Sequence, residues 1–188
     1  MNEVLNAIAL RSSTRAYTDE KLTEEEIKTL VTAGLQAPTA ANRQEVHFSV
    51  VSTDHPVIAE IEDAKREAML KEDMPEDRKK AILSNPNNSY YGAPTVIFIS
   101  ADKNNSWGKL DAGIATENIA LAAQGMGLGS LIVGSVKMAM ETEHKEHFAE
   151  ALGFPENYEF EVVIAVGHKN TEKAQHTYDE AKSVTYVK

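Results

Sequence analysis

Residues 111–136 read DAGIATENIALAAQGMGLGSLIVGSV, and this stretch decides the fold. From 111 to 126 it is apolar around most of a helical circumference. After Asp111 its only polar side chains are Thr116, Glu117, Asn118 and Gln124. A helix of this kind is buried on most of its sides. Its many alanines and glycines let a second backbone come close, so we expect another helix, or the same helix of a partner subunit, as its neighbour.

Two glycines end the predicted helix. Gly127 and Gly129 suit this place because glycine adopts a left-handed closing conformation at little cost. Residues 130–133 form a short apolar run, which predicts a buried strand that leads through Gly134 and Ser135 into a loop with exposed backbone amides. A core helix followed by a core strand needs no ligand, so this stretch alone leaves a structural and a ligand-binding interpretation open.

The composition excludes several classes of protein. A chain of 188 residues suggests a single domain, residues 1–188, or a domain whose core is completed by a partner. The net charge of −10 argues against nucleic acid and anionic membrane surfaces as partners. The absence of cysteine excludes disulfides and thiolate sites. Neither a signal peptide nor an apolar run near the roughly 20 residues of a membrane helix is visible, so a soluble cytoplasmic protein is expected.

Two of the six histidines, His144 and His147, have a spacing that metal ligands also show. They lie in the charged run 141–150, where this spacing is more typical of a solvated helix face. We therefore predict no metal site.

The N-terminal third of the chain contains two predicted helices. Residues 2–10 carry apolar side chains at helical spacing and end near Arg11. Thr23 and Glu26 form a capping box, so a second helix starts at Glu24 and stops before Pro38. The side chains expected to be buried in it are Ile27, Leu30, Val31 and Leu35.

A polar loop follows each of these two predicted helices. The loop Arg11-Ser12-Ser13-Thr14-Arg15 combines two guanidinium groups with three hydroxyls, a set of donors that suits a phosphate group. A solvated helix end with arginine near the negative dipole end is the alternative. Residues 39–44 form a second polar loop before a predicted strand at 47–51, and they are either a ligand contact or an ordinary connector.

Two further helical segments are predicted. Residues 56–83 are strongly charged and only loosely periodic, which indicates one or two exposed helices broken at Pro75. Residues 137–152 read as a single amphipathic helix.

The remaining strands are predicted from apolar runs at 95–100 and 160–166. Residues 184–187, Val-Thr-Tyr-Val, also have a strand pattern, but a polar run separates them from the core. A strand placed so late is suited to pairing with the sheet edge of a neighbouring subunit.

Four motifs in this order resemble those of the nitroreductase family of flavin-dependent oxidoreductases. Residues 11–15 resemble the family's opening phosphate loop, and residues 37–44, Ala-Pro-Thr-Ala-Ala-Asn-Arg-Gln, its second flavin loop. Gly92-Ala93-Pro94 is similar to the motif before the next strand, and residues 122–129 to the central helix and its glycine turn. The resemblance covers nearly the whole chain.

The resemblance implies an α+β fold, with a central, mostly antiparallel sheet flanked by helices and a C-terminal strand added to the partner's sheet. It also implies a homodimer with FMN in two sites at the subunit interface. NAD(P)H would reduce FMN at N5 and give way to a small-molecule electron acceptor, such as a nitroaromatic, a quinone or an enone, in a ping-pong hydride transfer. The flavin carries this chemistry, so no catalytic side chain and no metal ligand are predicted.

The family's contacts fall on three groups of residues in this sequence. The phosphate and ribityl end would be held by Arg11, Ser12 and Ser13, and the pyrimidine edge by Arg15. The other subunit would contribute Pro38, Thr39, Ala40 and Asn42. The ring would lie along Ile132, Val133, Gly134 and Ser135, with the amides near Gly134 and Ser135 facing N5 and O4.

The sequence departs from the family pattern in three places. Glu45-Val46 follows the second loop where many members have Pro-Trp. Members often carry a cation near the flavin where Asn88 aligns, or an asparagine where Asn85 aligns. The late arginine of the family is missing, and Lys182 is the nearest cation to its place, with Lys173 second. We therefore expect Asn88 and Lys182 among the flavin contacts.

Two alternatives to a catalytic function remain. The same fold and flavin could serve a non-catalytic FMN-binding or redox-sensing homodimer. A structural dimer with a solvated basic loop would bind no flavin at all.

Overall fold

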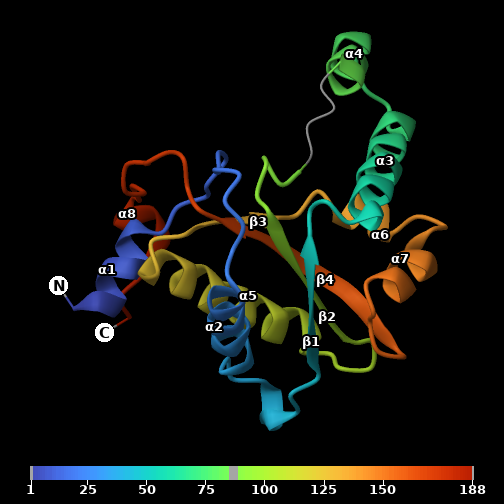
Figure 1. The fold of residues 1–188 in the computed structure, drawn as a ribbon. Helices are drawn as coiled ribbons and strands as arrows, with labels where there is room; N and C mark the ends of the chain where they lie inside the picture. The colour runs from blue at the N-terminus through green and yellow to red at the C-terminus, as the bar shows by residue number, and fades with distance from the viewer. Residues whose placement is uncertain (1, 85–88, 188) are drawn as a thin grey trace.

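The computed structural model of the protein describes residues 2–84 and 89–187. Helices and strands alternate irregularly along the chain, as Figure 1 shows. Their order is α1 (Glu3–Leu10), α2 (Glu24–Leu35), the 3-10 turn η1 (Ala40–Asn42), β1 (Val46–Ser52), α3 (Pro56–Lys71), α4 (Glu76–Ser84), β2 (Thr95–Asp102), α5 (Gly108–Gly125), β3 (Gly129–Val133), α6 (Lys137–Met140), α7 (Lys145–Ala151), β4 (Tyr158–Gly167) and α8 (Glu180–Ser183).

The four strands form one antiparallel sheet in the order β1-β2-β4-β3. The two central strands, β2 and β4, pair from Thr95 opposite Val166 to Asp102 opposite Tyr158. At the β3 edge, Gly129 lies opposite Gly167. The predicted α+β architecture with an antiparallel sheet is confirmed.

Helices cover both faces of the sheet (Figure 1). Because successive side chains of a strand point to opposite faces, β2 contributes to two cores. Val96 and Phe98 pack in the core beneath α3, α6 and α7, whereas Ile97 and Ile99 pack in the core with α2 and α5. This double cover explains why β2 is buried from Thr95 to Ala101 and reads as a continuous apolar run.

The central helix is α5, which begins three residues earlier than the sequence predicts, at Gly108. It ends at Gly125, and Gly127 follows with a φ of +77°. The Gly127 amide donates to the Gln124 carbonyl at 3.1 Å and the Leu128 amide to the Ala123 carbonyl at 2.8 Å. These two bonds are the Schellman arrangement that the glycine turn predicts, and they turn the chain into β3.

The predicted capping box of α2 is present: the Glu26 amide donates to Thr23 Oγ1, and the Thr23 amide to Glu26 Oε2. The prediction that Leu35 is buried is wrong, since 63% of it is exposed. Gly34 takes the inward position of the last turn instead. A Cβ there would come within 2.9 Å of the Phe48 ring, so the helix approaches β1 too closely for a larger side chain.

Two helical predictions need correction. The segment 56–83 does form two helices that separate before Pro75, but α3 is not simply exposed, because one face of it packs into the core. The predicted helix at 137–152 is two short helices, α6 and α7. Between them the Thr142 hydroxyl and amide both donate to the Ala139 carbonyl, at 2.7 and 3.1 Å, and this turn ends α6.

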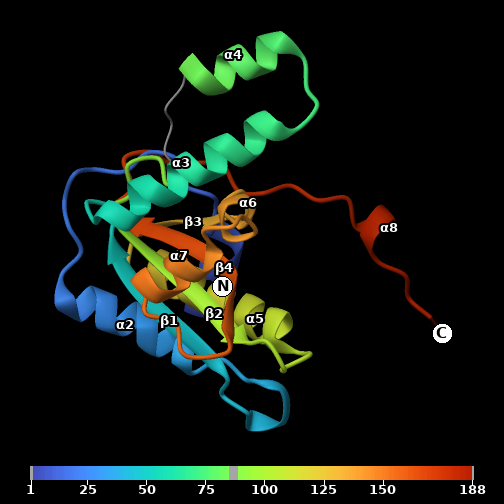
Figure 2. The same ribbon diagram turned by 90° about the vertical axis from the view of Figure 1, so that its right-hand side faces the viewer.

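The C-terminal tail leaves the body of the molecule after β4, and Figure 2 shows α8 standing well apart from the sheet. In this chain, residues 184–187 are not a strand, so their pairing with a partner's sheet stays a prediction. No helix within the described ranges combines the length and apolar character needed to cross a membrane.

Candidate functional site

The basic loop 11–15 lies directly against the edge strand β3. Ser13 and Ser130 form a parallel bridge, and the Thr14 amide donates to the Ser130 carbonyl at 2.9 Å. Gly129 makes this approach possible, because a Cβ there would come within 2.7 Å of Thr14 Oγ1. The fold thus joins two motifs that lie more than a hundred residues apart in the sequence.

A buried tyrosine supports the loop from below. The Tyr17 hydroxyl donates to the Thr14 carbonyl at 3.2 Å. Burial raises the pKa of the Tyr17 phenol well above its ordinary value, while the Arg15 charge opposes that shift. The phenol therefore stays protonated at neutral pH and keeps donating its hydrogen bond to the loop.

Three cations lie on or beside this loop. Arg11 Nε lies 3.6 Å from Glu117 Oε1 of α5, and Arg15 Cζ lies 5.8 Å from the centre of the Tyr91 ring. Lys173 comes from the C-terminal tail, and its ammonium donates to the Ser13 carbonyl at 2.5 Å. In a chain with a net charge of −10, this is a local basic site.

The exit of β3 follows four residues after the bridge at Ser130 and is open. Ile132 and the backbone at Gly134 and Ser135 are exposed, whereas Val133 is buried. A Cβ added at Gly134 would meet no heavy atom within 4 Å. The Gly134 and Ser135 carbonyls accept hydrogen bonds from the Lys137 and Met138 amides.

A buried polar cluster adjoins this exit, and the sequence analysis missed it. Lys65 donates to Glu62 Oε2 at 2.6 Å and to Ser89 Oγ at 2.5 Å, and the Ser89 amide donates to the same Glu62 oxygen at 3.0 Å. Ser89 Oγ lies 3.5 Å from Ser135 Oγ. The available signal was the i, i+3 spacing of Glu62 and Lys65 on the helix face that also carries Ile58 and Ile61.

The second predicted flavin loop lies away from loop 11–15 in space, at the bottom of Figure 1. It follows α2, and the Ala40 amide donates to Asp111 Oδ1 at 3.1 Å. Asn42 has a φ of +52°, a left-handed conformation that asparagine adopts more readily than most residues. Pro38, Thr39, Ala40 and Asn42 therefore do not meet Arg11 to Arg15 within one chain, and their contribution from another subunit stays a prediction.

Two further flavin contacts were predicted, Asn88 and Lys182. Asn88 lies outside the described residues. Within the described part of this chain Lys182 does not reach the loop, because its ammonium pairs with Asp179 at 3.4 Å and its side chain is 82% exposed. The path of the tail brings Lys173 to the loop instead, which was the second choice for the family's late cation.

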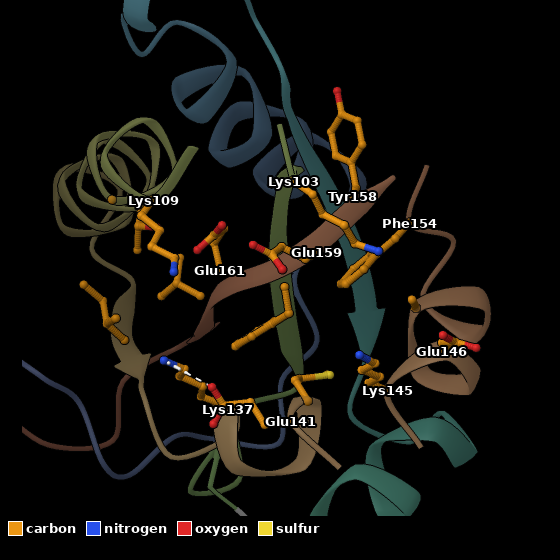
Figure 3. A pocket seen from close by; sticks show the side chains of 17 residues that line it. Lys103, Lys109, Lys137, Glu141, Lys145, Glu146, Phe154, Tyr158, Glu159 and Glu161 are labelled. Atoms are coloured by element: carbon orange, nitrogen blue, oxygen red, sulfur yellow. Dashed lines mark ion pairs between the residues drawn. The ribbon is translucent and has the colours of Figure 1, made fainter. Parts of the chain in front are cut away.

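A cavity of about 450 Å³ lies elsewhere, between α5, β4 and the α6–α7 segment (Figure 3). Of the predicted flavin contacts that the structure describes, only Ile132 lines it. Its charged lining is evenly mixed, with Lys103, Lys109, Lys137, Lys145, Glu141, Glu146, Glu159 and Glu161. Burial raises the pKa of Glu161, and Lys109 opposes that shift. An evenly mixed lining gives no preference for a phosphate, so this cavity is not the phosphate site.

His147 belongs to the short helix α7, and its Nε2 lies 2.7 Å from Glu60 Oε2 on the protein surface. Among the described residues, no group of three or more potential ligands has a geometry that could hold a metal ion.

The joined loop, strand and glycine turn agree with the comparisons with known proteins. The model of the nitroreductase family matches residues 8–168. The chain belongs to the nitroreductase family. It is 31% identical over 181 residues to a protein of Archaeoglobus fulgidus provisionally named an NADH dehydrogenase/NAD(P)H nitroreductase. The match covers 96% of this chain and 93% of that relative.

Two solved nitroreductases with bound FMN share the fold over the full length of both chains. One, from Desulfitobacterium hafniense, is 31% identical to this nitroreductase-family chain with a TM-score of 0.88. The other, from Bacteroides fragilis, is 27% identical with a TM-score of 0.87. The resemblance and the fold predicted from the sequence are confirmed.

Proposed function

We propose that this chain is an FMN-dependent oxidoreductase that uses NAD(P)H to reduce small electrophilic acceptors such as nitroaromatics, quinones or enones. Two more distant relatives carry names of the same class: an FMN reductase [NAD(P)H] from Bacillus subtilis, 24% identical over 159 residues, and an NADPH-flavin oxidoreductase from Vibrio harveyi, 27% identical over 175 residues. These names and the FMN-bound relatives support the cofactor and the electron donor.

The observation that carries the proposal is the junction of loop 11–15 with β3. It places basic and hydroxyl donors at the start of β3, and an exposed glycine with open space in front of it, Gly134, follows the end of the same strand. This donor set fits a flavin phosphate at one end, and the clear backbone at Gly134 fits a flat ring at the other. When bound, FMN supplies the hydride chemistry at N5.

The residues of this chain hold and orient the cofactor. Arg11, Ser12 and Ser13 bind the phosphate and ribityl end, and Arg15 places a cation at the pyrimidine edge. The backbone of Gly134 and Ser135 would offer amides to N5 and O4, and the exposed Ile132 would lie along the ring. The prediction that the Val133 side chain also lies there is wrong, because it is buried in the core. NAD(P)H and the acceptor occupy the open side in turn, which makes the sequence of events ping-pong.

The exposed apolar surface favours a homodimer. Helix α1 exposes Val4, Leu5, Ile8 and Leu10, each at 46% or more, and at the start of α5 Trp107 and Leu110 are each 54% exposed. Exposed apolar helix residues of this kind are suited to an interface. A second copy of the chain would cover it and would bring residues 38–42 to a site that loop 11–15 begins.

A colour and turnover assay distinguishes this function from a redox-sensing dimer and from a dimer that binds no flavin. Purified protein should be yellow, and it should oxidise NAD(P)H steadily once a quinone is added. A yellow protein that takes up electrons from NAD(P)H without turnover would support a redox-sensing dimer. A colourless protein that does not bind added FMN would contradict the proposal altogether.

We expect Lys173→Ala to weaken FMN binding by about three- to tenfold, because it removes both a charge near the phosphate and a hydrogen bond to the Ser13 carbonyl. The remaining binding should depend less steeply on salt concentration. Lys182→Ala is the matched control in the same tail and should leave the Kd unchanged. Fluorescence titration of FMN measures both, and a larger loss in Lys182→Ala would contradict the assignment.

A further inference from the structure

Tyr91 occupies a strained position in a tight turn beside loop 11–15. The Ala93 amide donates to the Tyr90 carbonyl at 3.0 Å, and the two residues between them have positive φ values, +54° at Tyr91 and +82° at Gly92. Turns of this kind favour asparagine or glycine at both central positions. A bulky side chain at the first of them is an outlier, and such outliers persist where a side chain is needed.

The Tyr91 ring projects from this turn to the most exposed cation of the loop. Arg15 Cζ lies 5.8 Å from the ring centre, within the distance at which a guanidinium is attracted to an aromatic face. Arg15 is exposed and forms no ion pair shorter than 4.0 Å with a carboxylate of the described residues. The ring is therefore the feature of the described surface that restricts where this guanidinium lies.

The turn itself is anchored on the opposite side. Tyr90 is fully buried in the core beneath α3. Ser89 is held by the buried pair Glu62 and Lys65. The position of the Tyr91 ring is thus fixed by the core of the protein rather than by the loop it contacts.

We propose that Tyr91 is a positioning residue that holds the Arg15 guanidinium where the pyrimidine edge of FMN binds, and thereby favours the reduced over the oxidised cofactor. The inference rests on the proposed function. Two-electron reduction places negative charge on that edge, so a fixed cation there stabilises the reduced form more than the oxidised form. A mobile arginine, free to turn into solvent, would provide less of this difference.

The test is the ratio of FMN affinities in the reduced and oxidised states, obtained from the midpoint potential. Tyr91→Leu should lower this ratio by about threefold, the size of an exposed cation–π contact, which is about 15 mV for a two-electron couple. Tyr91→Phe keeps the ring and should retain the ratio. In an Arg15→Met background, Tyr91→Leu should have no further effect. If Tyr91 only supported folding, Tyr91→Leu would leave the midpoint potential unchanged, with or without Arg15.

The contact can be measured without FMN. The cofactor-free forms of the unmodified protein, both single variants and the double variant are unfolded with denaturant. The change in midpoint in the double variant should differ from the sum of the changes caused by Tyr91→Leu and Arg15→Met alone. Tyr91→Asn relieves the strained φ, so it should have a Tm no lower than that of the unmodified protein while still lowering the potential.

The outcomes separate this inference from the function on which it rests. Failure of the unmodified protein to bind FMN would overturn the proposed function and, with it, the redox role of Tyr91. FMN-loaded Tyr91→Leu with an unchanged potential, or an equal shift in the Arg15→Met background, would overturn this inference alone. Additive unfolding midpoints would show that the ring does not hold the arginine.

Discussion

Gly129→Ala is expected to weaken FMN binding by about tenfold or more. A Cβ at this position would lie 2.7 to 2.9 Å from three side-chain atoms of Thr14. Thr14 is buried and β-branched, so its side chain has little freedom to move aside. Overpacking of this kind costs about 1–3 kcal/mol, and about 1.4 kcal/mol is a tenfold change in affinity. The strain falls on the bridge between Ser13 and Ser130, which holds the phosphate loop in place.

Gly125→Ala is the matched control, because a Cβ there would meet nothing within 4 Å. It lies at the end of α5, and its FMN affinity should equal that of the unmodified protein. Adding Thr14→Ala to Gly129→Ala should recover part of the lost affinity, since it removes two of the three clashing atoms. FMN titration of all three variants checks this, and an unchanged Kd in Gly129→Ala would show that the loop does not depend on this close approach.

Lys65→Met should reduce the free energy of unfolding by about 3–5 kcal/mol, because it leaves the Glu62 carboxylate buried without its partner charge. The side chains of this pair are only 10% and 9% exposed. The matched control is Arg66→Met on the same helix, where the Arg66–Asp63 pair has the same spacing but 35% and 64% exposure. An exposed pair contributes at most about 1 kcal/mol, so this control should be nearly neutral.

Urea unfolding measures both variants at neutral pH. The double variant Glu62→Gln, Lys65→Met removes the uncompensated charge and should regain part of the lost stability. Equal effects of Lys65→Met and Arg66→Met would contradict the burial of the ion pair.

Features decided by neighbouring residues were predictable from the sequence. The Thr23 and Glu26 capping box and the Gly127 turn involve bonds between residues three to five positions apart, so their geometry follows from the local pattern. The apolar runs of the strands were equally clear. Their antiparallel pairing came from the family resemblance, since an apolar run alone does not specify its neighbour.

Features decided by distant packing were not predictable. Glu62 and Lys65 have the same spacing as Asp63 and Arg66. The helix face that carries Ile58 and Ile61 indicates which pair is buried, but the approach of Ser89 to that pair required the folded chain. The helix predicted at 137–152 breaks at a turn that a smooth apolar period does not reveal.

In the candidate site, too, local features were predictable and features that depend on distant packing were not. Loop 11–15 and the exit of β3 were identified from their residue types, because phosphate donors and a glycine with exposed backbone are local features. The choice between Lys173 and Lys182 depends on the path of a polar tail, for which the sequence has no periodic signal. The ring of Tyr91 against Arg15 joins segments 76 positions apart and required the folded chain.

We propose that each FMN lies between loop 11–15 of one chain and residues 38–42 of another. The most direct test is the FMN content of a mixed dimer that carries Arg11→Glu in one chain and Ala40→Glu in the other, isolated with two different affinity tags. Both homodimers should fail to bind FMN. The mixed dimer has both changes in one site and neither in the other, so it should bind one FMN with the affinity of the unmodified protein. A mixed dimer that binds no FMN, or an Ala40→Glu homodimer that still binds two, would contradict the claim.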